Sequence, residues 1–390
     1  FGGILWGSAG ITVAWECYQQ YNDKALLEEH YDAMCEYIDY ILSKNIDSQT
    51  NVIVQEKVFG NLGDWLGPED KKNDKTLMWE AYFLYDLDIM FKIATLLDKP
   101  SDAARYKKLY EERLSFFRNT YISSENAKTI SSGADGPFKG EEVDIQTSYV
   151  LPLVFHLIPD SLKLDFSANL AHSIDRLNIA DDGKTYPPYS LMTGFIGTAW
   201  INIALSDNGY NDIAYTLLQQ TSYPSWLYSV EQGATTIWER LNSYTHIDGF
   251  GDNNRMNSFN HYSFGAVGAW MYSYSLGIQR DEDNPGFKKI ILSPQIDPTG
   301  KMTYAKGYYD SMYGRIESEW KVEGNHVNYH FAIPANTSAL LVLPAKSLSK
   351  IKESGRDVHK SIGIEVIKVE NKDIIFKLQS GKYNFQVNIE

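Results

Sequence analysis

The chain of 390 residues has two cysteines, Cys17 and Cys35, and they do not form a Cys-x-x-Cys pair. This scarcity argues against a disulfide framework and against a cysteine-based zinc site, and it leaves the compartment open. No apolar run reaches the roughly 18 residues that a membrane-spanning helix needs. The first residues, Phe1 to Gly10, lack the charged start and apolar stretch of a signal peptide, and the chain does not begin with Met.

Positive charge is also scarce. The chain has 36 Lys and Arg residues against 50 Asp and Glu residues, which gives a formal charge of −14. Such a field repels nucleic-acid phosphates and anionic membrane surfaces, and no local basic patch offsets it. We therefore expect neither a nucleic acid nor a membrane as a partner.

Several standard chemical motifs are missing as well. The sequence has no phosphate-binding loop, no His-Glu-x-x-His helix and no Gly-x-Ser-x-Gly nucleophile elbow. The expectation is therefore a site without a metal and without a cofactor.

Aromatic residues, in contrast, are plentiful: 9 Trp, 27 Tyr and 17 Phe. Trp and Tyr offer flat apolar faces with polar edges, which suit sugar rings, although core packing explains most single aromatics. Hydrophobic residues at 43% and charged residues at 22% are ordinary globular values. A large folded core is expected.

Up to about residue 280 the apolar spacing is mainly helical. Nine helices are predicted, at residues 8–21, 27–44, 76–97, 101–120, 145–157, 162–175, 191–205, 209–220 and 262–277. Short turns join some of them, whereas long loops rich in Gly, aromatic and polar residues separate others, at 60–74, 131–144, 180–190 and 222–260. This alternation indicates helical hairpins whose long loops gather on one face.

After Gly277 the pattern changes to a period of two, as in residues 314–320 and 327–333, with turn signals between the runs. Pro285, Pro294 and Pro298 mark a linker. The sequence therefore predicts a mainly α protein: a helical catalytic domain at 1–280, followed by a small antiparallel β-sandwich at 281–390.

Candidate site residues lie in the long loops. Glu239 stands between Trp238 and Arg240, where a guanidinium would hold the carboxylate ionised beside an aromatic platform. The alternative is a surface ion pair. His261 fits a structural histidine equally well, and Asp64, in a Gly-Asp-Trp turn, fits either an Asx turn or helix cap or a ligand contact.

Seven short sequence motifs, in this order along the chain, are similar to those of one known family. They are Trp6-Gly7, Gly63 to Leu66, Thr193 to Thr198, Leu205 to Gly209, Pro224-Ser225-Trp226, Gly233 to Arg240 and Met256 to Tyr262. Together they resemble family-78 glycoside hydrolases, the α-L-rhamnosidases, over the length of the chain. The resemblance implies an (α/α)6 toroid followed by a β-sandwich, inverting hydrolysis of terminal non-reducing α-L-rhamnose, and no catalytic metal.

Carried over position by position, the resemblance gives Glu239 the role of the general base and His261 that of a rhamnose-contacting histidine. Trp6 and Trp65 match the aromatics that wall the sugar pocket. Asp64 and Trp238 lie beside those positions and are carried as further substrate-binding candidates.

The chain departs from the family pattern in three ways. The family's general acid belongs to an acidic motif upstream of the Trp-Gly segment, but Trp6 is almost the first residue here. Ser8 stands where the family often has Asp. Nine helices fall about three short of the twelve in six hairpins. We therefore expect an incomplete toroid, an acid outside the sequence given, and little activity from the chain on its own.

Two other functions fit the same residues. The chain could be a non-catalytic sugar-binding remnant that lacks the acid, or another helical-toroid glycosidase or a polysaccharide lyase. In the leading hypothesis the partner is a rhamnose-containing oligosaccharide, polysaccharide or glycoside, and a periplasmic or secreted location is favoured over the cytoplasm. The oligomeric state, the aglycone and the linkage stay open.

Overall fold

The structure is a computed structural model that describes residues 3–55, 61–251, 256–370 and 372–388. The chain divides into two compact units. We call the first the helical unit (Phe1–Trp15 with Ala25–Val267) and the second the sheet unit (Glu16–Lys24 with Gly268–Glu390). Each is described by itself.

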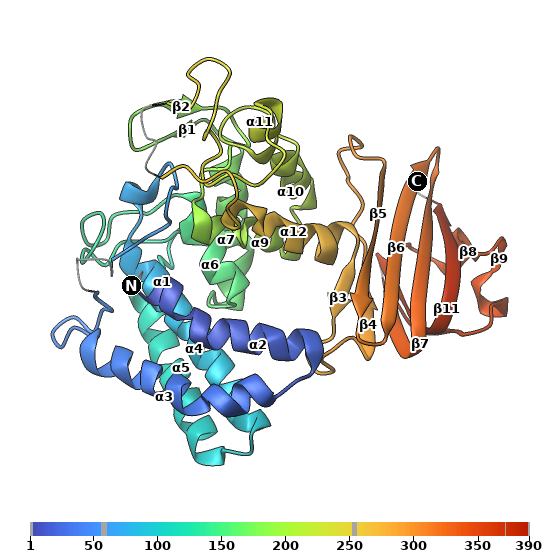
Figure 1. The fold of residues 1–390 in the computed structure, drawn as a ribbon, viewed down its shortest axis with the longest axis horizontal. Coiled ribbons are helices and arrows are strands. Elements are labelled where there is room, and N and C mark those ends of the chain that lie inside the picture. The colour runs from blue at the N-terminus through green and yellow to red at the C-terminus, as the bar shows by residue number, and fades with distance from the viewer. Residues whose placement is uncertain (1–2, 56–60, 252–255, 371, 389–390) are drawn as a thin grey trace. The chain divides into compact units, whose positions relative to one another are not determined.

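Helices dominate the first part of the chain (Figure 1). They are α1 (Ile4–Gly7), α2 (Ala9–Tyr21), α3 (Ala25–Lys44), α4 (Lys75–Leu96), α5 (Pro100–Tyr121), α6 (Gln146–Val154), α7 (Asp160–Ile174), α8 (Phe195–Thr198), α9 (Ile201–Asp207), α10 (Asn211–Leu218), α11 (Trp226–Glu231) and α12 (Val267–Trp270). A short two-stranded ribbon, β1 (Asn178–Ile179) and β2 (Thr185–Tyr186), lies in the loop between α7 and α8.

The centre of the helical unit is α4, which packs against α1, α3, α5 and α6. The Asp74 side chain caps its N-terminus by accepting a hydrogen bond from the Thr76 N–H. Most of its side chains are buried, including Glu80 at 0% exposure. Glu80 is paired with Arg113 of α5, whose guanidinium also donates to the Asn51 carbonyl at 3.1 Å. The Arg113 guanidinium thus matches the buried charge of Glu80.

The predicted helices agree with the structure except at two places. The segment predicted at 191–205 is extended up to Gly194 and forms α8 and α9 only afterwards. The segment predicted at 262–277 consists of a 3-10 turn (Ser263–Ala266), α12 and a π turn (Met271–Ser275). Gly265 and Gly268 weaken a regular α-helix there. Apolar spacing did not indicate the short helices α1 and α11.

Among its described residues, the sheet unit has nine strands in one sheet. They are β3 (Ile278–Arg280), β4 (Lys289–Leu292), β5 (Tyr304–Ser311), β6 (Gly314–Glu323), β7 (His326–Pro344), β8 (Ile351–Glu353), β9 (Arg356–Asp357), β10 (Ile364–Val369) and β11 (Asp373–Asn388). The main path runs β3-β4-β7-β11-β8-β9; β10 pairs with β11, and the hairpin β5-β6 joins β7 through β6. Alternate side chains of β7 and β11 enter one core, among them Phe331 and Phe385. The period-two prediction of a β domain is confirmed.

One pairing departs from the purely antiparallel domain that was predicted. Strand β4 runs parallel to β7, with Ile290 opposite Ala339. Two strands, β5 and β6, intervene in the chain between β4 and β7, so no hairpin constrains this pair to be antiparallel. Across residues 3–55, 61–251, 256–370 and 372–388, none of the helices combines the length and the apolar character required to span a membrane.

Candidate active site

The long loops of the helical unit are joined by hydrogen bonds between segments far apart in the sequence. The Asp181 N–H donates to the Pro68 carbonyl and the Leu191 N–H to the Pro224 carbonyl, both at 2.8 Å. The Lys75 N–H donates to the Asp135 carbonyl at 3.0 Å. The predicted loops therefore form one connected cluster.

Asp64 is the most heavily bonded residue of this cluster, and it is only 2% exposed. Its carboxylate accepts from the N–H groups of Gly194 at 2.8 Å, Ile196 at 2.9 Å and Gly197 at 3.0 Å. It also accepts a short hydrogen bond from the Thr147 hydroxyl. Asp64 thus caps the N-terminus of α8 and connects its own loop to α6 and α8, which is a capping role, one of the alternatives open for this residue. Both carboxylate oxygens are bonded.

Two further properties of Asp64 follow from this burial. Loss of solvation raises the pKa of its carboxyl to about 6, although the hydrogen bonds to Thr147, Gly197 and Gly194 oppose that rise. The backbones at Asp64 and Gly194 also lie close together, because a Cβ at Gly194 would lie 2.2 Å from the Asp64 carbonyl oxygen. Only glycine fits there.

Glu239 is half-buried and lies where residues 237–239 run alongside residues 258–261. Its N–H donates to the Ser258 carbonyl and its Oε2 accepts from the Ser258 N–H, both at 2.8 Å. Its Oε1 has no hydrogen-bond partner within the described ranges. One oxygen is therefore fixed by the backbone while the other can accept a proton from water.

His261 belongs to the same pairing, since its N–H donates to the Ile237 carbonyl at 2.8 Å. Its ring is stacked between Phe195, at 4.9 Å between centroids, and Tyr262, at 5.1 Å. The Nδ1 atom accepts from the Ser263 N–H at 3.3 Å. In the neutral ring the proton is then on Nε2, which can donate to a ligand.

The three tryptophans take different positions. Trp238 is 7% exposed and packs edge-to-face on Phe259 at 5.2 Å, so it supports the Glu239 backbone from within. Trp65 is half-buried, and its carbonyl accepts from the Phe195 N–H at 3.0 Å, which joins it to the ring beside His261. Trp6 is half-buried on α1, which packs on α4.

A buried polar cluster beside α1 was not found from the sequence. The Ser8 hydroxyl donates to Asp86 Oδ2 at 2.6 Å, and burial raises the pKa of Asp86 to about 8. The second oxygen of Asp86 and the Tyr37 hydroxyl are buried without a partner among the residues described. The only signal was Ser8 at the position where the family often has Asp.

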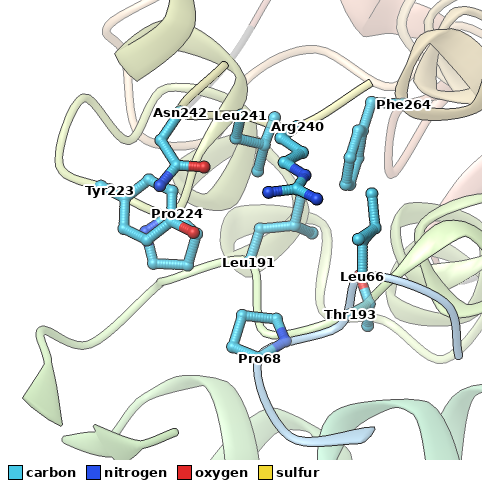
Figure 2. A pocket seen from close by; sticks show the side chains of 10 residues that line it. All are labelled: Leu66, Pro68, Leu191, Thr193, Tyr223, Pro224, Arg240, Leu241, Asn242 and Phe264. Atoms are coloured by element: carbon cyan, nitrogen blue, oxygen red, sulfur yellow. The ribbon is translucent and has the colours of Figure 1, made fainter. Parts of the chain in front are cut away.

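Glu239 and Arg240, for which a surface ion pair was the alternative to a functional role, form no ion pair with each other among the described residues. Among the described residues, the Glu239 carboxylate is bonded to the Ser258 N–H, and the Arg240 side chain lines a neighbouring cavity of about 300 Å³ (Figure 2). The residues that line this cavity are Leu66, Pro68, Leu191, Thr193, Tyr223, Pro224, Arg240, Leu241, Asn242 and Phe264. Sequence reasoning missed this cavity.

Comparisons with known proteins agree with one family throughout. The model of the bacterial alpha-L-rhamnosidase 6 hairpin glycosidase domain matches residues 1–275, and that of the bacterial alpha-L-rhamnosidase C-terminal domain matches residues 277–357. The chain is 31% identical over 389 residues to an alpha-L-rhamnosidase of Formosa agariphila, covering 98% of this chain and 38% of that protein. It is 32% identical to one of Streptomyces avermitilis, covering 98% of this chain and 33% of that protein.

Solved structures give the same result. The alpha-L-rhamnosidase of Streptomyces avermitilis complexed with L-rhamnose matches with a TM-score of 0.82 at 30% identity, over 98% of this chain and 33% of that one. The alpha-L-rhamnosidase from Dictyoglumus thermophilum matches with a TM-score of 0.81 at 30% identity, over 99% of this chain and 40% of that one. The chain thus spans between a third and two-fifths of the length of these relatives.

Proposed function

The chain belongs to the bacterial alpha-L-rhamnosidase family, with a six-hairpin glycosidase domain and the family's C-terminal domain, and from this premise we propose that the protein hydrolyses terminal non-reducing α-L-rhamnose from glycosides or polysaccharides with inversion at the anomeric carbon. The observation that carries the proposal is the carboxylate of Glu239, with one oxygen held and one oxygen open. The helical unit and the sheet unit correspond to the six-hairpin glycosidase domain and the C-terminal domain of this family.

Glu239 is proposed as the general base. In an inverting reaction the base removes a proton from a water that attacks the ring on the face opposite the leaving group. The Ser258 N–H fixes Oε2 and therefore orients Oε1 toward that water.

The general acid is not assigned to either buried carboxylate near the core. An inverting pair has its two carboxyl groups roughly 6.5 to 9.5 Å apart, with the acid free to reach the leaving oxygen. Asp64 is saturated by four donors and Glu80 is paired with Arg113. Neither has an oxygen to offer, so neither is proposed as the acid.

The sugar is proposed to sit between the Trp65 loop and His261. The Nε2–H of His261 donates to a rhamnose hydroxyl, and the stack with Phe195 and Tyr262 fixes the ring. Aromatic walls suit the 6-deoxy sugar, whose methyl group gains from apolar contact. Trp6 is proposed as a second wall, whereas the burial of Asp64 and Trp238 favours supporting roles.

The test, carried out on the full-length protein because little activity is expected from this chain on its own, is release of L-rhamnose from an aryl α-L-rhamnoside, with the anomer of the first product followed by NMR. Inversion predicts β-L-rhamnose as the first product. Release of the α-anomer would overturn the inverting mechanism, and retention of the sugar without turnover would favour a binding module. An unsaturated product would instead indicate a lyase.

A further inference from the structure

Helix α1 carries Trp6, the residue that the proposed function uses as a second wall of the sugar pocket. This helix has four residues, and a single turn is not stable without support from its surroundings. At its N-terminus the Ile4 N–H donates to Gln55 Oε1 at 2.8 Å. The position of Trp6 therefore depends on the side chains that hold α1 in place.

Ser8 joins the C-terminal end of α1 to α4. It is 1% exposed, and its hydroxyl donates at 2.6 Å to Oδ2 of Asp86, which is 0% exposed. The Ser8 carbonyl accepts from the N–H groups of Ile11 at 3.0 Å and Thr12 at 2.9 Å, which are the first hydrogen bonds of α2. Ser8 thus forms the junction between α1 and α2, and Asp86 is its side-chain partner.

Tyr37 of α3 contacts the same junction. A Cβ at Gly7 would lie 2.8 Å from the Tyr37 Oη, so the backbone of α1 lies directly against the Tyr37 hydroxyl. Gly7 stands between Trp6 and Ser8 in the chain. A shift of the Ser8 junction therefore changes the position of Trp6, because α1 is too short to absorb it.

The Asp86 carboxyl has no counter-charge. Its Oδ1 is buried without a hydrogen-bond partner in the described ranges, and no cation described there lowers its pKa, which burial raises to about 8. Burial and the charge of Asp86 raise the pKa of Tyr37. Burial and the charges of Asp64 and Asp86 raise the pKa of Tyr82, one turn earlier in α4. Solvation of an ionised Oδ1 requires that these packed groups move apart.

We propose that Asp86 is a positioning residue for rhamnose binding, because through Ser8 it sets the position of α1 and thereby of Trp6. This inference rests on the proposed function, which places Trp6 at the sugar. Without an acceptor at position 86 the buried Ser8 hydroxyl is unpaired, which is costly, so the junction moves toward another partner or toward water. Ionisation of Asp86 has the same effect on Trp6 by a different route.

The first test follows the position of Trp6 without any activity assay. In the full-length protein labelled with fluorotryptophan, fluorine NMR reports the surroundings of Trp6, whose resonance is identified by its loss in Trp6→Phe. This resonance should shift in Asp86→Leu and stay in place in Asp86→Asn, whose amide oxygen still accepts from Ser8. In the unmodified protein it should titrate with a midpoint near pH 8, and Asp86→Asn should abolish the titration. Asp88→Leu on the same helix, where Asp88 pairs with Lys92 at the surface, is the matched control.

The second test separates positioning from general support of the fold. On an aryl rhamnoside, Asp86→Leu should raise KM by about fivefold with little change in kcat, and Asp86→Asn should keep the KM of the unmodified protein. Trp6→Ala should raise KM by a similar factor. Asp86→Leu added to Trp6→Ala should then have no further effect, because both changes remove the same contact with the sugar.

The inference is overturned by a Trp6 resonance that stays in place in Asp86→Leu, by an equal titration in Asp86→Asn, or by KM effects that add in full. If Asp86→Leu does not fold, Ser8→Ala replaces it in both tests, since it removes the same hydrogen bond. Absence of rhamnose release by the unmodified protein refutes the proposed function, while the fluorine spectra still test the position of Trp6. Normal turnover with an unmoved Trp6 resonance refutes this inference alone.

Discussion

Glu239 and Ser258 exchange two hydrogen bonds: the Glu239 N–H donates to the Ser258 carbonyl, and the Ser258 N–H donates to the Glu239 carboxylate, both at 2.8 Å. The side chain is thereby fixed by the same residue that fixes its backbone. A base held in this way loses little freedom when the substrate binds.

The first prediction concerns this carboxylate in the full-length protein. Glu239→Gln keeps the size of the side chain and removes proton acceptance, so kcat should fall by at least about 100-fold with little change in KM. Steady-state kinetics on an aryl rhamnoside measure this. Glu231→Gln, at the exposed end of α11, is the control and should retain activity.

Azide provides a check on the same variant. A small anion can replace the activated water, so Glu239→Gln with azide should yield a rhamnosyl azide of inverted configuration. Turnover equal to that of the unmodified protein in Glu239→Gln would remove this residue from the mechanism.

The second prediction concerns the Trp65 wall. Trp65→Ala should weaken rhamnose binding by about tenfold, because stacking contact is worth on the order of 1 kcal/mol, while the loop persists through its backbone bonds. Rhamnose titration and thermal unfolding measure the two effects. Tyr304→Ala, an exposed aromatic of the sheet unit, is the control, and a large fall in Tm with unchanged affinity would mark Trp65 as a core residue.

The third prediction concerns the tautomer of His261. The Ser263 N–H at Nδ1 requires the neutral ring to carry its proton on Nε2, which nitrogen-detected NMR of the histidine ring can observe. His261→Phe keeps the stack with Phe195 and Tyr262 but removes this donor. KM should rise by about tenfold with folding unchanged, the cost of one hydrogen bond. A proton found on Nδ1 would contradict the assignment.

The fourth prediction concerns Asp64. Asp64→Asn places an amide N–H against backbone N–H donors, so at least one of them loses its acceptor. The free energy of unfolding should fall by about 2 kcal/mol or more, as measured by denaturant titration. Asp182→Asn, an exposed change of the same kind, should cost far less. An equal loss in the free energy of unfolding of both variants would show that the hydrogen bonds of Asp64 do not hold these segments together.

The fifth prediction concerns pH and Asp86, whose pKa is raised to about 8 by burial from an ordinary value near 4. Between these values the unfolded chain has released a proton that the folded chain keeps. The free energy of unfolding therefore falls as pH rises from about 4 to 8, by at most about 1.4 kcal/mol per pH unit.

Asp86→Asn should remove this slope and leave the protein more stable than the unmodified protein at pH 8, since the neutral amide can still accept from Ser8. Denaturant titrations at several pH values measure the difference. Asp88→Asn on the same helix is the control. Parallel pH profiles for the unmodified and Asp86→Asn proteins would show that Asp86 is ionised in the fold.

The sequence predicted those features that are determined by residues close together in the chain. Helices α4 and α5 were recognised because an apolar period acts within a few residues. The contacts of Asp64 with Thr147 and Gly194 span 83 and 130 positions, and no local pattern encodes them.

Adjacency in the sequence was misleading at Glu239. The alternative of a pair with Arg240 assumed that neighbouring side chains meet, but the Glu239 carboxylate accepts from the Ser258 N–H while the Arg240 side chain lines the cavity. The partner of Glu239 is 19 positions away in the chain, and no local pattern indicates it.

The hydrogen bonds to the Asp64 carboxylate have a consequence for protein engineering. One set of hydrogen bonds joins Asp64 to Thr147 of α6 and to residues Gly194 to Gly197 at the start of α8. None of these three segments can therefore be exchanged alone. A graft of the Trp65 loop from a relative would leave its carboxylate without matching donors, or the donors without a carboxylate. Exchange of substrate preference between members of this family should therefore succeed when the three segments are transplanted as one block.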